Sequence, residues 1–188
     1  MNHLRSSAAV VLAAVLLVAG LGLQEPSSVS ASADASVPTV PDGIAVPAGV
    51  DLLFWSHAAG VQTYACQDGM WVFHAPRALL FDPQDGRPVA QHYGGIDRNL
   101  TPGPWWEAFS DSSRMRAGNA VPAPSPNPDS IPLLRLQVLQ REGTGMFSRV
   151  SYIQRLNTMG GVGPAGACDT SARVSVPYTA DYYFYGTP

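Results

Sequence analysis

Five residues in the middle of the chain combine side-chain types that bind small molecules: His92, Tyr93, Trp105, Trp106 and Glu107. Exposed Trp and Tyr rings offer apolar faces with a polar tip, which can stack on a sugar ring or anchor a protein partner. Adjacent side chains diverge along an extended chain, so we expect one of the two tryptophans to be buried and the other exposed. We therefore predict a ligand- or partner-binding site in the segment from residue 92 to 111.

Catalysis is the alternative use of the same segment. His92, Glu107 and Asp111 could serve a secreted hydrolase, with or without a metal ion, if the fold brings them around one pocket. No serine stands in the G-x-S-x-G context of a hydrolase nucleophile, and no residue is assigned a catalytic role. A structural surface protein without a pocket is the third hypothesis.

Metal ligands are not predicted. The histidines at 57, 74 and 92 could combine with Asp97, Glu107 or Asp111, but no two of them have the H-x-H or H-x3-H spacing of a ligand pair. Any such site would have to be assembled entirely by the fold.

The N-terminus has the organisation of a cleaved signal peptide. One positive charge at Arg5 precedes an apolar run over residues 8–23, and the small residues Ala31 and Ala33 suit signal peptidase. The run is shorter than the roughly 20 residues of a spanning helix. We predict a signal peptide over 1–33, cleavage after Ala33, secretion, and no membrane span in the mature protein. An extended, Pro-rich leader would follow over 34–49, and one domain over 50–188.

The charge argues against nucleic acid as a partner. The chain has 11 Arg and Lys residues against 14 acids, and every one of the 11 is an arginine. The arginines are scattered and form no basic stripe. The expected partner is instead an extracellular ligand, glycan or protein, bound by a monomer.

Cys66 and Cys168 are the only cysteines. Exported proteins meet oxidising conditions, and two is the simplest even number, so we predict one Cys66–Cys168 disulfide.

Alternating apolar residues favour strands along most of the chain. The clearest run is 173–185, and Asp68-Gly69 is a typical hairpin turn between the runs 61–67 and 70–74. Over 146–156 the alternation predicts one face of Met146, Val150, Tyr152 and Leu156. The Pro-rich region 96–128 is predicted to be a crossing loop. Seven or eight strands without helices predict an all-β fold, an antiparallel sandwich or barrel.

Several phrases resemble one family across residues 50–185. They are YACQ (64–67), WVF (71–73), PRALLFD (76–82), HY (92–93), GPxWE (103–107), IPxL (131–134), VSYIQRxNTxGG (150–161), CD (168–169) and VPYTADYYFY (176–185). Together they resemble the domain of unknown function 3455 family of secreted proteins. The resemblance implies an exported domain without an established function.

Some fungal relatives carry a malate dehydrogenase label, and residues 161–166 (GVGPAG) do match the dinucleotide fingerprint G-x-G-x-x-G. That fingerprint works only where a strand turns into a helix whose N-terminus holds the pyrophosphate. Here a second strand follows, and Asp181, at the spacing of the ribose-binding acid, lies within it. We therefore reject the dehydrogenase hypothesis and predict no cofactor.

Overall fold

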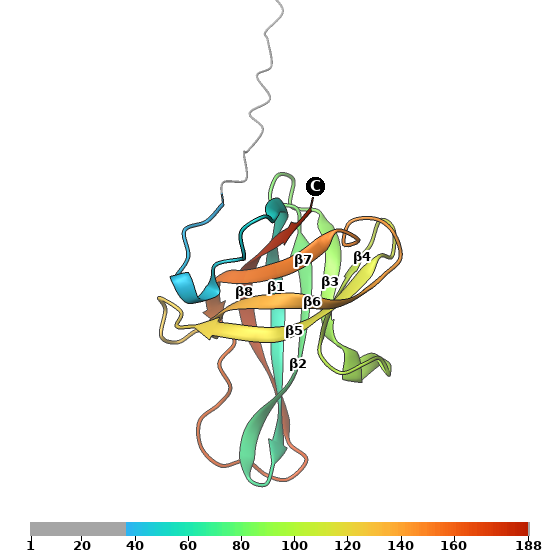
Figure 1. Ribbon diagram of the computed structural model, residues 1–188. Helices are drawn as coiled ribbons and strands as arrows, with labels where there is room; N and C mark the ends of the chain where they lie inside the picture. The colour runs from blue at the N-terminus through green and yellow to red at the C-terminus, as the bar shows by residue number, and fades with distance from the viewer. Residues whose placement is uncertain (1–36, 188) are drawn as a thin grey trace, which may run out of the picture. The chain divides into compact units, whose positions relative to one another are not determined.

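The computed structural model describes residues 37–187, which form a barrel with two short 3-10 helices, η1 (Asp42–Ile44) and η2 (Gly95–Arg98) (Figure 1). The strands are β1 (Asp51–Gln67), β2 (Met70–Phe81), β3 (Pro88–Gly94), β4 (Pro104–Ala108), β5 (Arg114–Ala123), β6 (Leu133–Glu142), β7 (Val150–Gly160) and β8 (Arg173–Gly186). Each strand pairs antiparallel with the next, and β8 pairs with β1, so the sheet closes. This confirms the predicted all-β class.

Alternation along each strand separates an inner from an outer face. In β8 the inner residues Tyr178, Ala180, Tyr182 and Phe184 are at most 3% exposed, which confirms the pattern predicted for this run. Phe184 stacks on Phe54 of β1 with ring centroids 4.5 Å apart. Aromatic side chains therefore fill part of the barrel interior.

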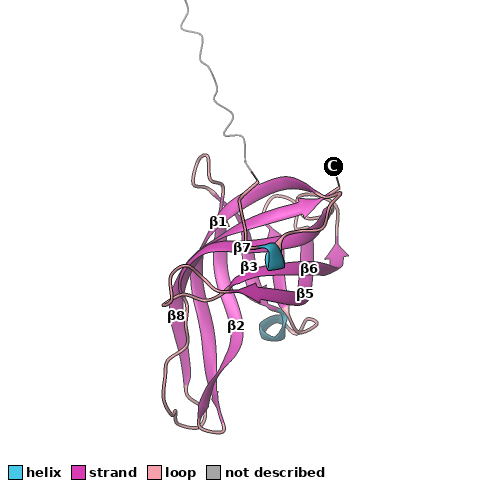
Figure 2. Ribbon diagram, turned by 60° about the vertical axis from the view of Figure 1, so that its left-hand side comes forward, coloured by secondary structure: helices cyan, strands magenta, loops and turns pink. Residues whose placement is uncertain are grey.

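The β1–β2 hairpin extends beyond the barrel (Figure 2). Asp68 and Gly69 form its turn with φ angles of 51° and 77°, as the predicted two-residue turn requires. The β7–β8 connection lies against this hairpin, because the Cys168 amide donates to the Gly69 carbonyl at 3.1 Å. The predicted Cys66–Cys168 disulfide is present, with Cα atoms 5.8 Å apart.

The prediction of a crossing loop over 96–128 is wrong, because this region contains β4 and β5. Proline is tolerated at position 122 since β4 pairs only with residues 114–116, so the second half of β5 has one neighbouring strand, β6. The shortness of β4 leaves the barrel wall incomplete beside residues 117–123 of β5.

The segment before β1 packs on the outside of the barrel. Ile44 is fully buried in an outer cluster with Leu133 and Leu156, and its carbonyl accepts a hydrogen bond from Gln154 Nε2 at 2.6 Å. Part of the predicted leader is therefore held against β6 and β7. The predicted signal peptide and its cleavage site lie outside the described residues.

Candidate functional site

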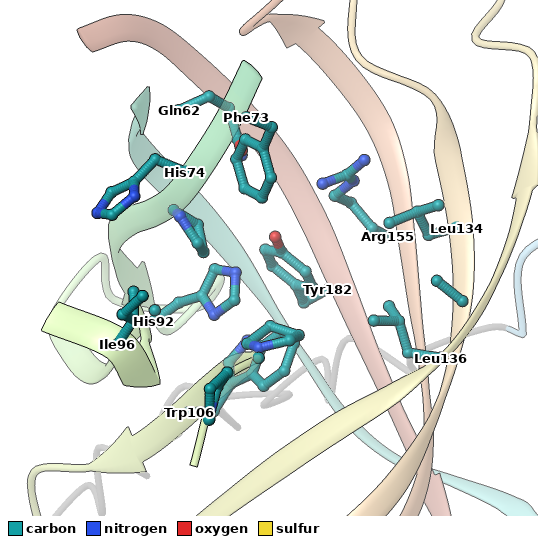
Figure 3. Close-up of a pocket in the computed structure, with 16 residues that line it drawn as sticks. Gln62, Phe73, His74, His92, Ile96, Trp106, Leu134, Leu136, Arg155 and Tyr182 are labelled. Atoms are coloured by element: carbon teal, nitrogen blue, oxygen red, sulfur yellow. The ribbon is translucent and has the colours of Figure 1, made fainter. Parts of the chain in front are cut away.

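A cavity of about 340 Å³ lies inside the barrel (Figure 3). Most of its lining is apolar, and its sixteen residues are Gln62, Phe73, His74, Pro76, His92, Gly94, Ile96, Pro102, Gly103, Pro104, Trp106, Ala120, Leu134, Leu136, Arg155 and Tyr182. Seven of the sixteen come from residues 92–106, because β3, η2, the following loop and β4 form one wall. This volume is at the lower end of the range for small-molecule sites.

His92 and Trp106 form the aromatic part of this wall. They are register partners on β3 and β4, and their rings stack with centroids 4.0 Å apart. His92 Nδ1 lies 2.8 Å from the Trp105 carbonyl oxygen, which can only accept, so Nδ1 carries the proton. Nε2 is then a hydrogen-bond acceptor. Burial lowers the pKa of His92 to about 3, so the ring is neutral at physiological pH.

Two buried N–H groups of the lining have no hydrogen-bond partner among the described residues. They are Gln62 Nε2 on β1 and Trp106 Nε1 on β4, in side chains that are 2% and 1% exposed. Leaving a buried donor unpaired costs about 1–3 kcal/mol. Such groups are rare in native proteins, and both belong to side chains that line this cavity.

Arg155 on β7 and Tyr182 on β8 supply polar groups from the other side of the barrel. Arg155 Nε and Nη2 both donate to the Pro132 carbonyl, at 3.2 and 2.8 Å. The hydroxyl of Tyr182 lies 3.3 Å from that of Tyr178, and burial raises the pKa of Tyr178 well above its usual value. Tyr178 therefore keeps its proton.

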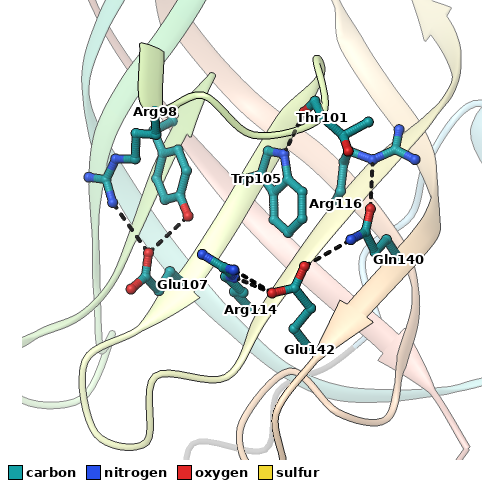
Figure 4. A network of polar contacts seen from close by, with 9 residues as sticks. Arg98, Thr101, Trp105, Glu107, Arg114, Arg116, Gln140 and Glu142 are labelled. Atoms are coloured by element: carbon teal, nitrogen blue, oxygen red, sulfur yellow. Dashed lines mark hydrogen bonds and ion pairs between the residues drawn. The ribbon is translucent and has the colours of Figure 1, made fainter. Parts of the chain in front are cut away.

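Three predicted site residues lie on the outer face instead (Figure 4). The Tyr93 hydroxyl donates to Glu107 Oε2 at 2.8 Å, and the Arg98 guanidinium lies 3.7 Å from the centre of the Tyr93 ring. Trp105 Nε1 donates to the Thr101 carbonyl at 2.9 Å. The five predicted residues are thus divided between the cavity, with His92 and Trp106, and this outer network, with Tyr93, Trp105 and Glu107.

The expectation that one of the two tryptophans is exposed is wrong, because each is only 1% exposed. The side chains do diverge, as predicted for a strand. Trp106 faces the cavity, while Trp105 is covered on the outer face by the loop after η2 and by Arg114, whose guanidinium lies 5.5 Å from the ring centre. These two rings therefore form no exposed aromatic platform.

The remaining polar candidates are spread over the molecule. His57 pairs with Asp181 at 2.8 Å, and His74 pairs with Asp97 at 3.0 Å. Asp111 lies in the β4–β5 turn, where it accepts from the Met146 amide at 2.9 Å. Hydrogen bonds from Ser113 and Met146 lower the pKa of Asp111 to about 2. Within residues 37–187 no three His, Cys, Asp or Glu side chains are placed to hold a metal ion.

The glycine-rich stretch 161–166 lies in the β7–β8 connection, and the strand β8 follows it. The helix N-terminus that a dinucleotide site needs does not follow this stretch, and Asp181 contacts His57 and Asn157. The stretch is therefore a connection between strands.

Sequence reasoning missed Gln62, Arg155 and Tyr182 as cavity residues. Gln62 and Arg155 are polar residues on inward-facing positions of β1 and β7. A polar residue among the inward-facing positions of a strand indicates such a cavity residue. The sequence shows this only when it is known which alternate positions of the strand face inward.

These features define a closed antiparallel β-barrel with an internal, mainly apolar cavity. The family model described as protein of unknown function (DUF3455) matches residues 47–186, so the chain belongs to this family. Comparison with curated proteins finds no match, and comparison with solved structures finds none either. In the part of the chain described here, no helix is both long and apolar enough to cross a membrane.

Proposed function

We propose that this protein is an exported, non-enzymatic binding protein that holds a small, largely apolar organic molecule inside its barrel. The observation that carries the proposal is the cavity of about 340 Å³, with unpaired N–H groups on Gln62 and Trp106. Apolar walls with a few placed polar groups are typical of small-molecule sites, where the walls give affinity and the polar groups orient the ligand.

Access to the cavity is consistent with an apolar ligand. Phe73 and Ile96, which both line the cavity, are 51% and 53% exposed. Large apolar side chains at a cavity rim give an entering apolar molecule a favourable first contact. Ala120, on the part of β5 that β4 does not cover, is also an exposed lining residue.

Binding is favoured over hydrolysis for two reasons. A histidine with a pKa of about 3 is a weak base near neutral pH, so His92 is poorly suited to take a proton from water. Glu107 is bound to Tyr93 and Arg98 on the outer face, and Asp111 is held by amides of the β4–β5 and β6–β7 turns. The three residues of the hydrolase hypothesis therefore do not surround one pocket.

Secretion is part of the proposal. The disulfide between Cys66 and Cys168 is compatible with an oxidising, extracellular environment. N-terminal sequencing of the exported protein is expected to begin at Asp34, and a mature chain that keeps residues 1–33 would contradict the predicted cleavage.

The binding proposal is tested by blocking the cavity. Thermal unfolding is measured with a panel of small aromatic and alkyl compounds for the wild type, Ala120→Trp and Ala165→Trp. The control residue Ala165 is an exposed alanine in the β7–β8 connection that does not line the cavity. A compound at a hundred times its Kd should stabilise the wild type and Ala165→Trp by about 2.7 kcal/mol, and Ala120→Trp much less. Equal shifts in all three proteins, or no shift with any compound, would contradict the proposal.

A further inference from the structure

The one permanent charge of the cavity lining is positive, and the nearby Asp97 carboxylate is paired with the lining residue His74 at 3.0 Å. Arg155 is the one permanently charged side chain of the lining, and no Asp or Glu of the described residues lines the cavity. His92 contributes a neutral ring. An anion bound in the cavity would therefore be attracted to the Arg155 charge, and no carboxylate of the lining would repel it.

The hydrogen-bond partners of Arg155 differ from those of several surface arginines. Arg87, Arg98 and Arg114 are each paired with a carboxylate, that of Asp85, Glu107 and Glu142 respectively. Arg155 has only the Pro132 carbonyl, bound by Nε and Nη2, so Nη1 has no hydrogen bond to a described residue. A guanidinium matches the geometry of a carboxylate, with two parallel N–H···O bonds.

Other free donors line the same cavity. Trp106 Nε1 can only donate, and Gln62 Nε2 is likewise an amide donor. Trp106 lies on β4, Gln62 on β1 and Arg155 on β7, so the donors come from three separated parts of the barrel wall. Figure 3 shows Arg155 and His92 reaching inward from opposite sides. A ligand with acceptor oxygens complements these donors.

We infer that the cavity binds a small monocarboxylic acid in its ionised form, with an aromatic or short alkyl body packed on His92, Trp106 and Leu136 and the carboxylate facing Arg155. This inference rests on the proposed function and specifies the class of its ligand. A neutral ligand of the same shape would fill the apolar volume but leave the Arg155 charge without a counter-ion.

The test compares acids with their neutral counterparts. Calorimetric Kd values are measured at pH 7 for benzoate, cinnamate and octanoate, and for the methyl ester of each. The acids are ionised at this pH, because carboxyl pKa values lie near 4. Binding of the acids is expected to be at least about tenfold tighter than that of the esters, which corresponds to about 1.4 kcal/mol.

Two arginine variants identify the group responsible. Arg155→Gln should weaken binding of the acids about tenfold and leave the esters unchanged, while Arg155→Lys should retain part of the preference. The control is Arg135→Gln. Arg135 is the register partner of Gln154, the residue before Arg155, and it also donates to a backbone carbonyl, that of Ala45 at 2.9 Å, but it does not line the cavity. Arg135→Gln should change neither affinity. Undiminished ester binding to Arg155→Gln also shows that this variant is folded.

The outcomes separate the two proposals. If esters bind as tightly as acids, and Ala120→Trp blocks both, the carboxylate inference is overturned and the proposed function stands. If an acid preference exists but persists in Arg155→Gln, the assignment to Arg155 is overturned. If neither acids nor esters bind in a way that Ala120→Trp blocks, both proposals are overturned for a ligand of this class.

Discussion

His92 and Trp106 lie face to face inside the barrel, with ring centroids 4.0 Å apart and an interplanar angle of 14°. The pair is assembled by the antiparallel register of β3 and β4, which also sends Tyr93 and Trp105 to the outer face. Stacking on Trp106 and the hydrogen bond to the Trp105 carbonyl hold the imidazole in one orientation. His92 thus presents its Nε2 acceptor in a fixed position while the Trp106 N–H remains free.

His92 makes the protein sensitive to acid. Its pKa is about 3 in the folded protein and 6.5 in the unfolded chain, so between these values the unfolded chain binds one proton more. The free energy of unfolding should therefore fall as the pH drops below 6.5, by about 1.4 kcal/mol per pH unit from this residue. The measurement is urea denaturation at pH 7, 6, 5.5 and 5.

His92→Phe keeps a flat ring against Trp106 and removes the titrating group. This variant should lose most of the slope between pH 6 and 5. Asp111 does not affect this comparison. Hydrogen bonds from its neighbours lower the pKa of Asp111 to about 2, so its contribution to the free energy of unfolding is lost only below pH 5. An unchanged slope in His92→Phe would show that the acid sensitivity has another origin.

We expect the Gln62 side chain to lower the stability of the fold and to contribute to ligand binding. Its side chain is 2% exposed and its Nε2 has no described partner, so Gln62→Met should leave the free energy of unfolding unchanged or raise it by about 1 kcal/mol. The same change should weaken binding of any cavity ligand that accepts from this amide. Urea denaturation and calorimetry measure the two effects.

Gln154→Met is the matched control. Gln154 is also buried, at 1% exposed, but its amide group is hydrogen-bonded on both sides: the nitrogen donates to the Ile44 carbonyl, and the oxygen accepts from the Tyr185 hydroxyl at 2.7 Å. This variant should lose about 1–3 kcal/mol, because Ile44 and Tyr185 are left with unpaired polar groups. Equal destabilisation by both substitutions would mean that Gln62 has a partner in solution.

The disulfide is expected to stabilise the whole domain. Cys66 and Cys168 are 102 residues apart in sequence, and a cross-link over so long a loop strongly restricts the unfolded chain. Cys66→Ser with Cys168→Ser should lower the free energy of unfolding by about 2–5 kcal/mol. The affinity for a cavity ligand should change little, because neither cysteine lines the cavity. If the double variant is still folded but no longer binds the ligand, the β1–β2 hairpin contributes to the cavity site, and this prediction is wrong.

Parts of this fold could be predicted from local chemistry. The alternation along β8, the Asp68-Gly69 turn and the pairing of the two cysteines are each determined by a few neighbouring residues or by composition, and each is confirmed. The sequence does not predict the strands β4 and β5, because the prolines and turn residues in and near them resemble a loop. Their pairing depends on neighbours far away in sequence.

The cavity residue Arg155 could not be predicted, because the predicted alternation holds at Val150 but not in the rest of β7. The sequence favours an inner face of Met146, Val150, Tyr152 and Leu156, whereas Ile153 packs in the inner core, Arg155 lines the cavity and Leu156 belongs to the outer cluster. The register shifts between Val150 and Tyr152, and the segment before β1 covers part of the outer face. Since both faces of β7 contain buried apolar residues, hydrophobicity alone does not distinguish them.

The most direct test of the cavity as the binding site is the indole N–H region of a ¹⁵N NMR spectrum during titration with cinnamate. The chain has four tryptophans, and among them only Trp106 lines the cavity, whereas the Trp105 N–H is bound to Thr101. The Trp106 resonance, assigned with Trp106→Phe, should move with the ligand concentration while the Trp105 resonance stays in place. If the Trp106 resonance stays in place while Trp55 or Trp71 responds, the ligand binds outside the barrel and the account is contradicted.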